Sequence, residues 1–176
     1  MRIIAGTLGG RNFGSPRSQR THPMSDKVRG ALFNALGDIE GLSLLDAFAG
    51  SGALSFEAVS RGASTALAID NDKPAQQAIE ESIASLGLGA RVRLIKANCG
   101  SWSDNNPAQQ FDIIVADPPY DKLQPAILTK LTKHLKPGGL YVLSWPGGAV
   151  APELGGCSLA AHKSYGDAQL LFFRQA

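Results

Sequence analysis

The stretch that most constrains the fold of this chain is Phe111–Tyr120, a short apolar run followed by Asp-Pro-Pro-Tyr. Phe111 and residues 113–116 are apolar and mostly β-branched, which is typical of a strand buried on both faces of a parallel sheet. Pro118 and Pro119 lack an N–H and hold φ at about −65°, so sheet pairing cannot continue past them. The sequence therefore predicts an α/β fold with a rigid turn at the carboxyl edge of its sheet, where ligands bind in this class.

The chemistry of this turn suits a planar exocyclic amine. The Asp117 carboxylate and the Pro118 carbonyl can each accept one amino hydrogen, and the Tyr120 ring offers a face for stacking. An amine held in this way directs its nitrogen lone pair away from both acceptors, toward an electrophile on the opposite side. The alternative is that Asp117 only caps the following helix. The motifs upstream favour the functional interpretation.

A glycine turn follows a strand predicted over residues 42–48. Gly50-Ser51-Gly52 lets a ligand approach the backbone close to the free N–H groups of a helix start. A dinucleotide-binding fingerprint would require a further glycine where this chain has Ser55. Instead, Asp46 stands four residues before the first glycine. Its carboxylate is a candidate partner for the α-ammonium group of an amino-acid-bearing ligand, directly or through water.

The next two predicted strands also end in polar residues. Residues 64–69 lead to Asp70, about twenty residues after the glycines, where a carboxylate can accept both hydroxyls of a ribose. Asp-Asn-Asp is also a favourable turn sequence, which is the alternative role for Asp70. Asn98 follows a strand over residues 92–97, and its amide suits an adenine edge, although a plain loop role remains open.

The remaining pattern predicts five strands alternating with helices, followed by an antiparallel pair. Ser25 is a candidate N-cap and Gly37 the end of the first helix. Residues 101–110 are polar and predicted to be exposed, with Trp102 either a lid over a ligand or part of the core. Helices are predicted over 25–36, 54–61, 74–86 and 123–135, a fifth strand over 140–145, antiparallel strands over 158–164 and 168–174, and a small hairpin over 2–13.

The composition is that of one globular domain. The chain has 176 residues, of which 44% are hydrophobic and 18% charged. It contains no apolar run long enough for a membrane span and no apolar signal region at its N-terminus, so a cytoplasmic protein is expected. Cys99 and Cys157 lie far apart without metal-ligand spacing, which predicts reduced cysteines and no metal site.

The charge is unevenly distributed along the chain. Residues 1–30 carry a net charge of +5, whereas the remainder carries −3. We therefore expect residues 1–24 to form a basic arm that contacts a polyanion, attached to a main domain over residues 25–176. The alternative is a solvated tail without function. The candidate phosphate contacts in this region are Arg2, Arg11, Arg17, Arg20, His22 and Arg29.

Taken together, Asp46-Ala-Phe-Ala-Gly-Ser-Gly, Asp70, Asp117-Pro-Pro-Tyr and the terminal hairpin resemble the class I S-adenosylmethionine-dependent methyltransferases that modify amino groups. Arg2-Ile-Ile-Ala-Gly, the run from Pro23 to Asn34, Phe48-Ala-Gly-Ser-Gly-Ala-Leu and Ser60-Arg-Gly-Ala resemble the RsmD family more narrowly. That family methylates a guanine N2 in the RNA of the bacterial small ribosomal subunit. The likeness extends from Arg2 to Arg174, with His22 standing where the family usually has arginine.

The resemblance implies a Rossmann-like fold, a mostly parallel seven-stranded sheet with helices on both faces, and S-adenosylmethionine as the cofactor. It implies a catalytic turn formed by Asp117, Pro118, Pro119 and Tyr120. The expected partner is ribosomal RNA, within a partly or fully assembled small subunit, without a metal and without a membrane. The implied cofactor-binding residues are Asp46, Phe48, Ala49, Gly50, Ser51, Gly52, Asp70, Asn71, Asn98 and Cys99.

Two other functions are compatible with parts of this pattern. A DNA adenine-N6 methyltransferase shares the Asp-Pro-Pro-Tyr turn and the glycine turn, but this length leaves no room for a separate target-recognition domain. A non-catalytic RNA-binding protein on a methyltransferase fold is the second alternative. The presence of Asp46, Asp70 and Asp117 together argues against it, because an inactive site need not keep all three.

Overall fold

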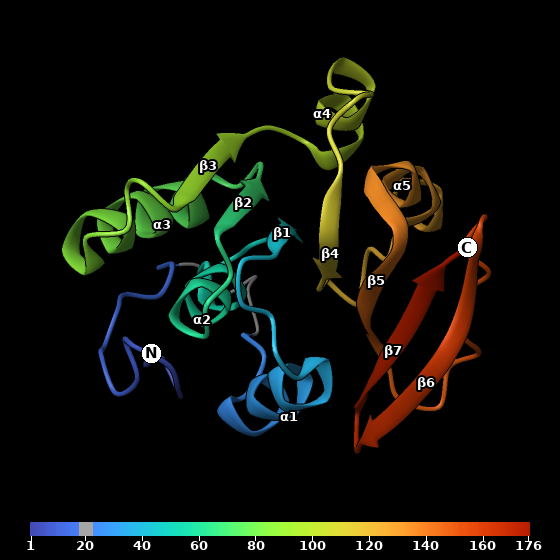
Figure 1. Cartoon of the computed structure of the whole chain (residues 1–176), viewed down its shortest axis with the longest axis horizontal. Coiled ribbons are helices and arrows are strands. Elements are labelled where there is room, and N and C mark those ends of the chain that lie inside the picture. The colour runs from blue at the N-terminus through green and yellow to red at the C-terminus, as the bar shows by residue number, and fades with distance from the viewer. Residues whose placement is uncertain (18–22) are drawn as a thin grey trace.

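The computed structural model describes residues 1–17 and 23–176, and its centre is a single seven-stranded sheet. The strands follow the spatial order β3-β2-β1-β4-β5-β7-β6, and β7 pairs antiparallel with both β5 and β6 (Figure 1). The strands β1 to β5 pair in parallel with one another, which confirms the predicted architecture. The strand bounds are β1 Ser43–Ala47, β2 Thr65–Asp70, β3 Val92–Lys96, β4 Phe111–Ala116, β5 Leu135–Pro146, β6 Cys157–Tyr165 and β7 Ala168–Gln175.

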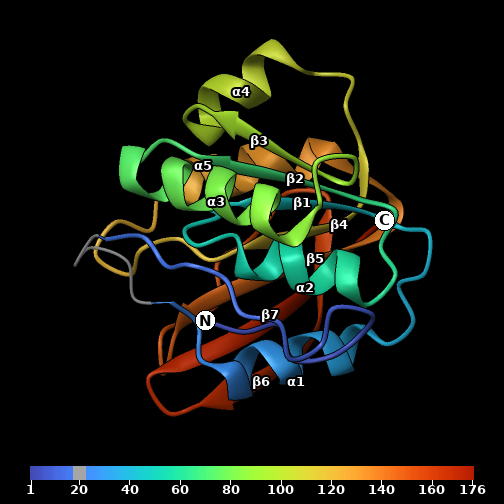
Figure 2. The same cartoon turned by 90° about the vertical axis from the view of Figure 1, so that its left-hand side faces the viewer.

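Helices cover both faces of this sheet. Figure 2 shows α4 on one side and α1 and α2 on the other. Buried residues of α1, α2 and α3 pack in one hydrophobic cluster, and those of α4 and α5 pack in a second. The helices are α1 Asp26–Leu36, α2 Ala53–Ser60, α3 Lys73–Leu86, α4 Cys99–Asn105 and α5 Pro125–Leu131, followed by a 3-10 turn over Thr132–His134.

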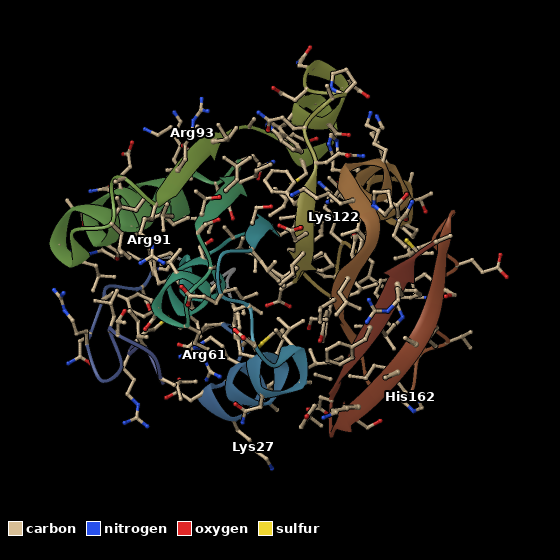
Figure 3. All side chains as sticks on the ribbon, viewed as in Figure 1. Lys27, Arg61, Arg91, Arg93, Lys122 and His162 are labelled. Carbon is tan, nitrogen blue, oxygen red and sulfur yellow. The ribbon has the colours of Figure 1, made fainter. Side chains whose placement is uncertain are left out.

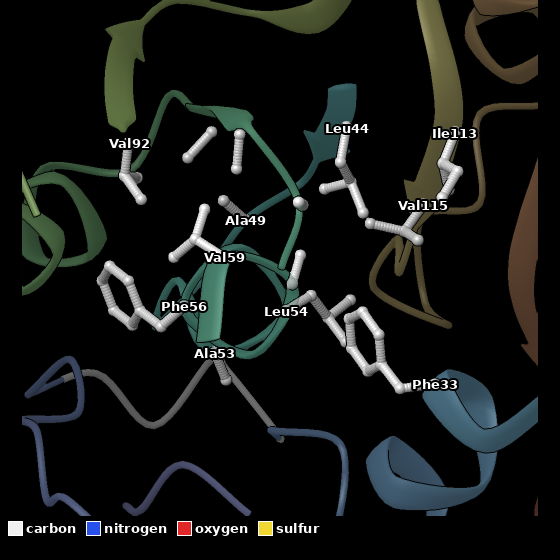
Figure 4. Packing of buried hydrophobic residues seen from close by; sticks show 14 of the residues in the cluster. Phe33, Leu44, Ala49, Ala53, Leu54, Phe56, Val59, Val92, Ile113 and Val115 are labelled. Carbon is white, nitrogen blue, oxygen red and sulfur yellow. The ribbon is translucent and has the colours of Figure 1, made fainter. Parts of the chain in front are cut away.

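The alternation of side chains along each strand decides which polar residues meet. In β1, Leu44 belongs to the cluster that contains α1, α2 and α3, and Leu45 belongs to the cluster that contains α4 and α5, the α4–α5 cluster. Successive strand residues point to opposite faces, so Asp46 faces the same side as Leu44. By the same rule, Asp117 would follow Val115 onto that side as β4 ends. Figure 4 shows Phe33 of α1 reaching toward Leu54 of α2 within this cluster.

Local capping agrees with the sequence at α1. The Ser25 hydroxyl accepts the Val28 N–H at 3.2 Å, and the chain leaves the helix at Gly37 with φ of 73°. The structure differs after β3, where residues 99–105 form helix α4 instead of an exposed polar segment. The Asn98 side chain accepts the N–H groups of Gly100 and Ser101, so it starts a helix that its serine-rich sequence does not reveal.

Helix α4 also settles the role of Trp102. This side chain is 5% exposed and lies in the α4–α5 cluster. Its ring centroid is 4.6 Å from that of His134 and 6.3 Å from that of Phe111. Trp102 is therefore part of the core and not a lid.

The segment after α5 is the second difference from the sequence prediction. The helix expected to reach residue 135 ends at Leu131, and β5 begins at Leu135, upstream of Pro137-Gly138-Gly139. The register between β4 and β5 shifts between Phe111 and Ile113, which accommodates the Pro-Gly-Gly residues inside the strand. A Cβ on Gly139 would lie 2.8 Å from the Asp112 carbonyl oxygen, so glycine is required there.

The N-terminal residues form the predicted small hairpin, with one antiparallel bridge instead of two regular strands. Arg2 and Asn12 make a single antiparallel bridge, and the Ile3 N–H donates to the Arg11 carbonyl at 2.9 Å. Ile3 is 1% exposed and Phe13 is 7% exposed, so this loop packs on the domain. Across the described part of the chain, the helices are too short or too polar to cross a bilayer.

Candidate active site

Three carboxylates gather at the carboxyl edge of the sheet. Asp46 lies near the end of β1, Asp70 ends β2, and Asp117 directly follows β4. Since these strands are neighbours in the order β2-β1-β4, their ends lie side by side, and the topology reverses between β1 and β4. This is the position where open α/β sheets bind their ligands.

Asp117 and the glycine turn line the same cavity. This cavity has a volume of about 40 Å³, and Asp117, Gly50 and Ser51 are among the residues that line it. Burial raises the pKa of Asp117 to about 6, against the opposing effect of the Ser144 hydroxyl. The other residues that line this cavity are Pro23, Met24, Arg29, Phe48, Ala49, Ala53 and Leu54.

The Asp-Pro-Pro-Tyr turn presents its aromatic residue outward. Pro118 is buried, whereas Pro119 is exposed and Tyr120 is 39% exposed. The Tyr120 hydroxyl is 2.8 Å from the Ser144 hydroxyl on β5, which restrains the ring. Ser144 is a residue that sequence reasoning missed, because a lone serine in an apolar strand carries no recognisable signal.

The glycine turn has the backbone conformation that its sequence requires. Gly50 and Gly52 adopt φ of 58° and 81°, and a Cβ on Gly52 would lie 2.8 Å from the Phe56 ring. Phe48 also has positive φ, at 60°, an uncommon conformation for a non-glycine residue that is found often at functional sites. Gly52 caps α2 and lines neither of the cavities described here.

A second cavity, of about 100 Å³, is also lined by Phe48. It collects five of the predicted cofactor-binding residues, namely Phe48, Asp70, Asn71, Asn98 and Cys99. Ile69, Ala97, Lys122 and Gln124 complete the lining, and the last two were not predicted from the sequence. The two cavities share Phe48 and together follow the edge from β2 to β4.

The polar side chains of the second cavity are held by backbone groups. Asp70 Oδ2 accepts the Gly50 N–H at 2.8 Å, and Oδ1 accepts the Asp72 N–H at 2.8 Å. The carboxylate of Asp70 therefore fixes the glycine turn relative to β2. Burial raises the pKa of Asp70, and it raises the pKa of the Cys99 thiol to about 12. Cys99 consequently stays a neutral thiol and acts as an apolar wall.

Asp46 is placed differently from what the sequence suggested. It is 1% exposed, lines neither cavity, and its Oδ2 accepts both the N–H and the hydroxyl of Ser55. The pKa of Asp46 is raised to about 7, mainly by burial and also by the charges of Asp117 and Asp70, against the lowering effect of the Ser55 hydrogen bonds. The direct structural effect of Asp46 is to hold α2, and with it the glycine turn, against β1.

The predicted phosphate contacts fall into three groups. Arg2, Arg11 and Arg17 are exposed, and Arg20 and His22 lie outside the described residues. The prediction for Arg29 is wrong, because its side chain is 1% exposed and its guanidinium donates to the Arg2 carbonyl and to Asp26. Arg29 occupies the buried face of α1, so it is not a phosphate contact on the surface of the protein.

Two further observations delimit the site. A larger groove, of about 500 Å³, lies at the opposite edge of the sheet beside the starts of β2, β3 and β4. Its lining includes Arg91, whose guanidinium donates to the Val59 and Ala63 carbonyls, but it contains none of the three acids. Among residues 1–17 and 23–176, there is no cluster of three or more potential His, Cys, Asp or Glu metal ligands.

The strand order, the glycine turn and the acids at the carboxyl edge define a Rossmann-like fold of the class I methyltransferase type. The family model described as Conserved hypothetical protein 95 matches residues 1–174. The chain belongs to this family, the RsmD family of class I methyltransferases.

Curated relatives and a solved structure agree with this membership. The chain is 37% identical to "Ribosomal RNA small subunit methyltransferase D" of Escherichia coli K12 over 121 residues, which cover 68% of this chain and 60% of the length of that relative. It is 31% identical to "Putative rRNA methyltransferase YlbH" of Bacillus subtilis 168, with 94% of each chain covered. The solved structure "Putative methyltransferase yhhF from Escherichia coli" has a TM-score of 0.86 at 30% identity and covers 99% of this chain and 97% of its own.

Proposed function

We propose that this protein transfers a methyl group from S-adenosylmethionine to the exocyclic N2 amine of a guanine in small-subunit ribosomal RNA. The observation that carries the proposal is that Asp117, in the Asp-Pro-Pro-Tyr turn, lines the same cavity as the glycine turn. Support for the RNA substrate comes from the relatives, which are named as ribosomal RNA methyltransferases.

The residues at the carboxyl edge fit the proposed cofactor. S-adenosylmethionine carries positive charge on its sulfonium and α-ammonium groups, and it supplies a methyl group on a good leaving group. The acids Asp46, Asp70 and Asp117 give this edge a negative potential that favours such a cation. Asp70, Asn71 and Asn98 would hold the adenosine part in the second cavity, and the glycine turn would hold the amino-acid part.

The Asp-Pro-Pro-Tyr turn would orient the amine. Asp117, with a pKa of about 6, is mostly ionised at neutral pH and accepts one amino hydrogen, while the Pro118 carbonyl accepts the other. The nitrogen–carbon bond forms as the sulfur–carbon bond breaks, and the amine then loses a proton to Asp117 or to water. Asp117 contributes mainly positioning and electrostatic stabilisation, since a strong base is not required.

The exposed half of the turn fits a nucleobase turned out of its stack. Tyr120 presents its ring at the surface, where a guanine that has left its RNA helix can stack on it. The exposed Arg2, Arg11 and Arg17 provide phosphate contacts in the N-terminal region, which we propose as the RNA-contacting part of residues 1–24. Because this basic surface is small, we propose a partly or fully assembled small ribosomal subunit as the substrate.

The test is methyl transfer to defined nucleic acids. Purified protein is incubated with labelled S-adenosylmethionine and, separately, small ribosomal subunits, naked small-subunit RNA and duplex DNA, and modified nucleotides are mapped by mass. Incorporation at a guanine N2 in ribosomal RNA is the expected result. Incorporation into DNA adenine would support the DNA methyltransferase alternative, and cofactor binding without transfer to any of the three would contradict the proposal.

The variant Asp117→Ala separates chemistry from cofactor binding. Removal of the amine acceptor should lower turnover by at least about a hundredfold, because orientation and charge stabilisation at the reacting nitrogen are lost. The affinity for S-adenosylmethionine, measured by calorimetry, should fall far less than turnover, because Asp117 supplies only part of the negative potential at this edge. A parallel loss of cofactor affinity and turnover would contradict the assigned role of Asp117.

A further inference from the structure

A buried glutamate connects the N-terminal loop, residues 1–13, to the helix that begins at the glycine turn. Glu57 of α2 is 0% exposed. Its Oε2 accepts the Ile4 N–H at 2.9 Å, and its Oε1 accepts the Ala5 N–H at 3.1 Å and the Arg61 Nε–H at 2.8 Å. A fully buried carboxylate is costly unless donors surround it, and here two of its three donors belong to the N-terminal loop.

The same face of α2 makes further contacts to this loop. Ser60, one turn after Glu57, donates to the Ala5 carbonyl at 2.6 Å and accepts the Leu8 N–H at 2.9 Å. Gly6 approaches so closely that a Cβ on it would lie 1.9 Å from the Ser60 carbonyl oxygen. Phe13 packs edge-on against Phe56 with ring centroids 5.1 Å apart. The loop is therefore fixed on α2 in a single orientation.

Two arginines extend this network to α1. The Arg29 Nη2 donates to the Arg2 carbonyl at 2.7 Å and to Asp26 at 2.9 Å, and its Nε lies 3.9 Å from Glu57 Oε2. Arg61 lies between α2 and α1 in Figure 3, where it also donates to Asn34 at 3.0 Å. The buried charge of Glu57 is thus shared among the loop, α1 and α2.

The opposite end of α2 belongs to the candidate active site. Gly52 caps this helix, and Ser55, two residues before Glu57, donates to Asp46. Pro23 and Met24, which precede α1, line the cavity together with Asp117. One short helix of eight residues therefore joins the proposed methyl-donor site to the loop that carries Arg2 and Arg11.

We propose that Glu57 is a positioning residue that fixes the N-terminal loop, and the RNA contacts on it, relative to the methyl donor. The proposal rests on the proposed function, because it assigns the loop to the RNA substrate. It predicts that loss of the Glu57 carboxylate weakens the productive binding of RNA and leaves the cofactor site and the chemical step intact.

The variant Glu57→Gln tests this role with little change in volume. Glutamine keeps one acceptor but turns an NH₂ group toward an N–H donor of the loop, so at least one loop contact is lost. Glu153→Gln, at an exposed glutamate, is the matched control. Three experiments are carried out on each protein. The first measures hydrogen exchange of the Ile4 and Ala5 amides, and the second measures KM and kcat for methylation of small ribosomal subunits. The third measures the affinity for S-adenosylmethionine by calorimetry.

We expect the loop amides of Glu57→Gln to exchange at least about tenfold faster. The KM for the ribosomal particle should rise by about fivefold or more, while kcat and cofactor affinity stay within about twofold of wild type. Unchanged amide exchange, or a fall in kcat with an unchanged KM, would overturn the proposal. If Glu57→Gln does not fold, Ser60→Ala, which removes two loop contacts from the same face of α2, is measured with the same expected outcomes.

The failure of this inference is distinguishable from failure of the proposed function. If wild-type protein methylates no ribosomal RNA, the proposed function fails, and the binding of the particle to wild type and Glu57→Gln replaces KM as the readout. If wild type is active and Glu57→Gln matches it in KM and in amide exchange, the positioning role alone is wrong.

Discussion

At the scale of single residues, the site is governed by buried carboxylates close to their ionisation midpoints. Burial raises the pKa of Asp46 to about 7 and that of Asp117 to about 6, so both acids exchange protons near neutral pH. A cationic ligand favours the ionised form of each acid and therefore lowers its pKa. Protonation and cofactor binding must then oppose each other.

The first prediction is that binding of S-adenosylmethionine releases protons near pH 6. Affinity should increase as the pH is raised from 5 to about 7.5, because fewer protons then have to leave the two acids. Calorimetry in two buffers of different ionisation enthalpy measures the release directly. S-adenosylhomocysteine, which lacks the sulfonium charge, should release fewer protons, and Asp46→Asn should remove part of the effect. A binding enthalpy that is independent of the buffer would contradict the prediction.

The second residue-scale prediction concerns Ser144. Its hydroxyl lies 2.8 Å from that of Tyr120, so Ser144→Ala frees the ring that is proposed to stack on the base. We expect kcat/KM for the RNA substrate to fall about fivefold, which corresponds to one hydrogen bond of about 1 kcal/mol. Tyr120→Phe removes the same bond and should cost a similar amount. Because the Ser144 hydroxyl also lowers the pKa of Asp117, the double variant should cost less than the sum of the two single variants, and full additivity would show that the Ser144–Tyr120 contact has no role.

At the scale of elements, α4 and the 3-10 turn over Thr132–His134 are joined by a buried histidine. The Ser103 hydroxyl lies 2.8 Å from His134 Nε2, and His134 Nδ1 lies 2.7 Å from the Gln109 carbonyl oxygen. A carbonyl only accepts, so Nδ1 carries the proton and Nε2 accepts from Ser103. Burial lowers the pKa of His134, against the raising effect of the Gln109 hydrogen bond.

The third prediction follows from this neutral histidine. Because the pKa of His134 is lowered in the folded state, the neutral side chain stabilises the fold above about pH 6.5, which is the pKa of histidine in the unfolded chain. This stabilisation is lost as the pH falls below that value. The difference in unfolding free energy between wild type and His134→Gln, from urea titrations, should therefore shrink between pH 7.5 and pH 5.5. A difference that stays constant over this pH range would contradict the assignment.

At the scale of the whole molecule, the N-terminal loop is part of the folded domain. Ile3 and Phe13 belong to the same hydrophobic cluster as Leu44 of β1 and Val115 of β4. The boundary proposed at residue 24 is therefore not a boundary between folding units, because the loop and the sheet bury one common core.

The fourth prediction is that the loop and the domain unfold together. Phe13→Ala should lower the unfolding free energy by about 3 kcal/mol, because it removes a buried ring that packs on Phe56. Asn12→Ala, at the exposed neighbour, should have little effect. Thermal unfolding, followed by tryptophan fluorescence and by far-ultraviolet circular dichroism, should show one transition in each protein. A separate early transition for the loop would contradict a common core.

Particular residues show how far the sequence could be interpreted on its own. Pro118 and Pro119 restrict their own backbone, so the end of β4 and the rigid turn after it were predictable from local chemistry. The strands on either side were also recognisable, because buried parallel strands are continuous apolar runs. Helix α4 was missed because its start depends on Asn98 capping two N–H groups, while its serines carry no helical periodicity.

The chain by itself determined the order of strands and helices, the glycine turn and the rigid corner after β4, because each depends on backbone restrictions or apolar periodicity within a few residues. Only the tertiary structure decided which polar side chains are buried and with whom. Arg29 looks like a phosphate contact until α1 packs on α2, and Glu57 looks like a surface residue until the N-terminal loop supplies its donors. The Arg2 carbonyl and the Ile4 and Ala5 amides, which are partners of these charges, lie far away along the chain, and burial is set by packing between elements.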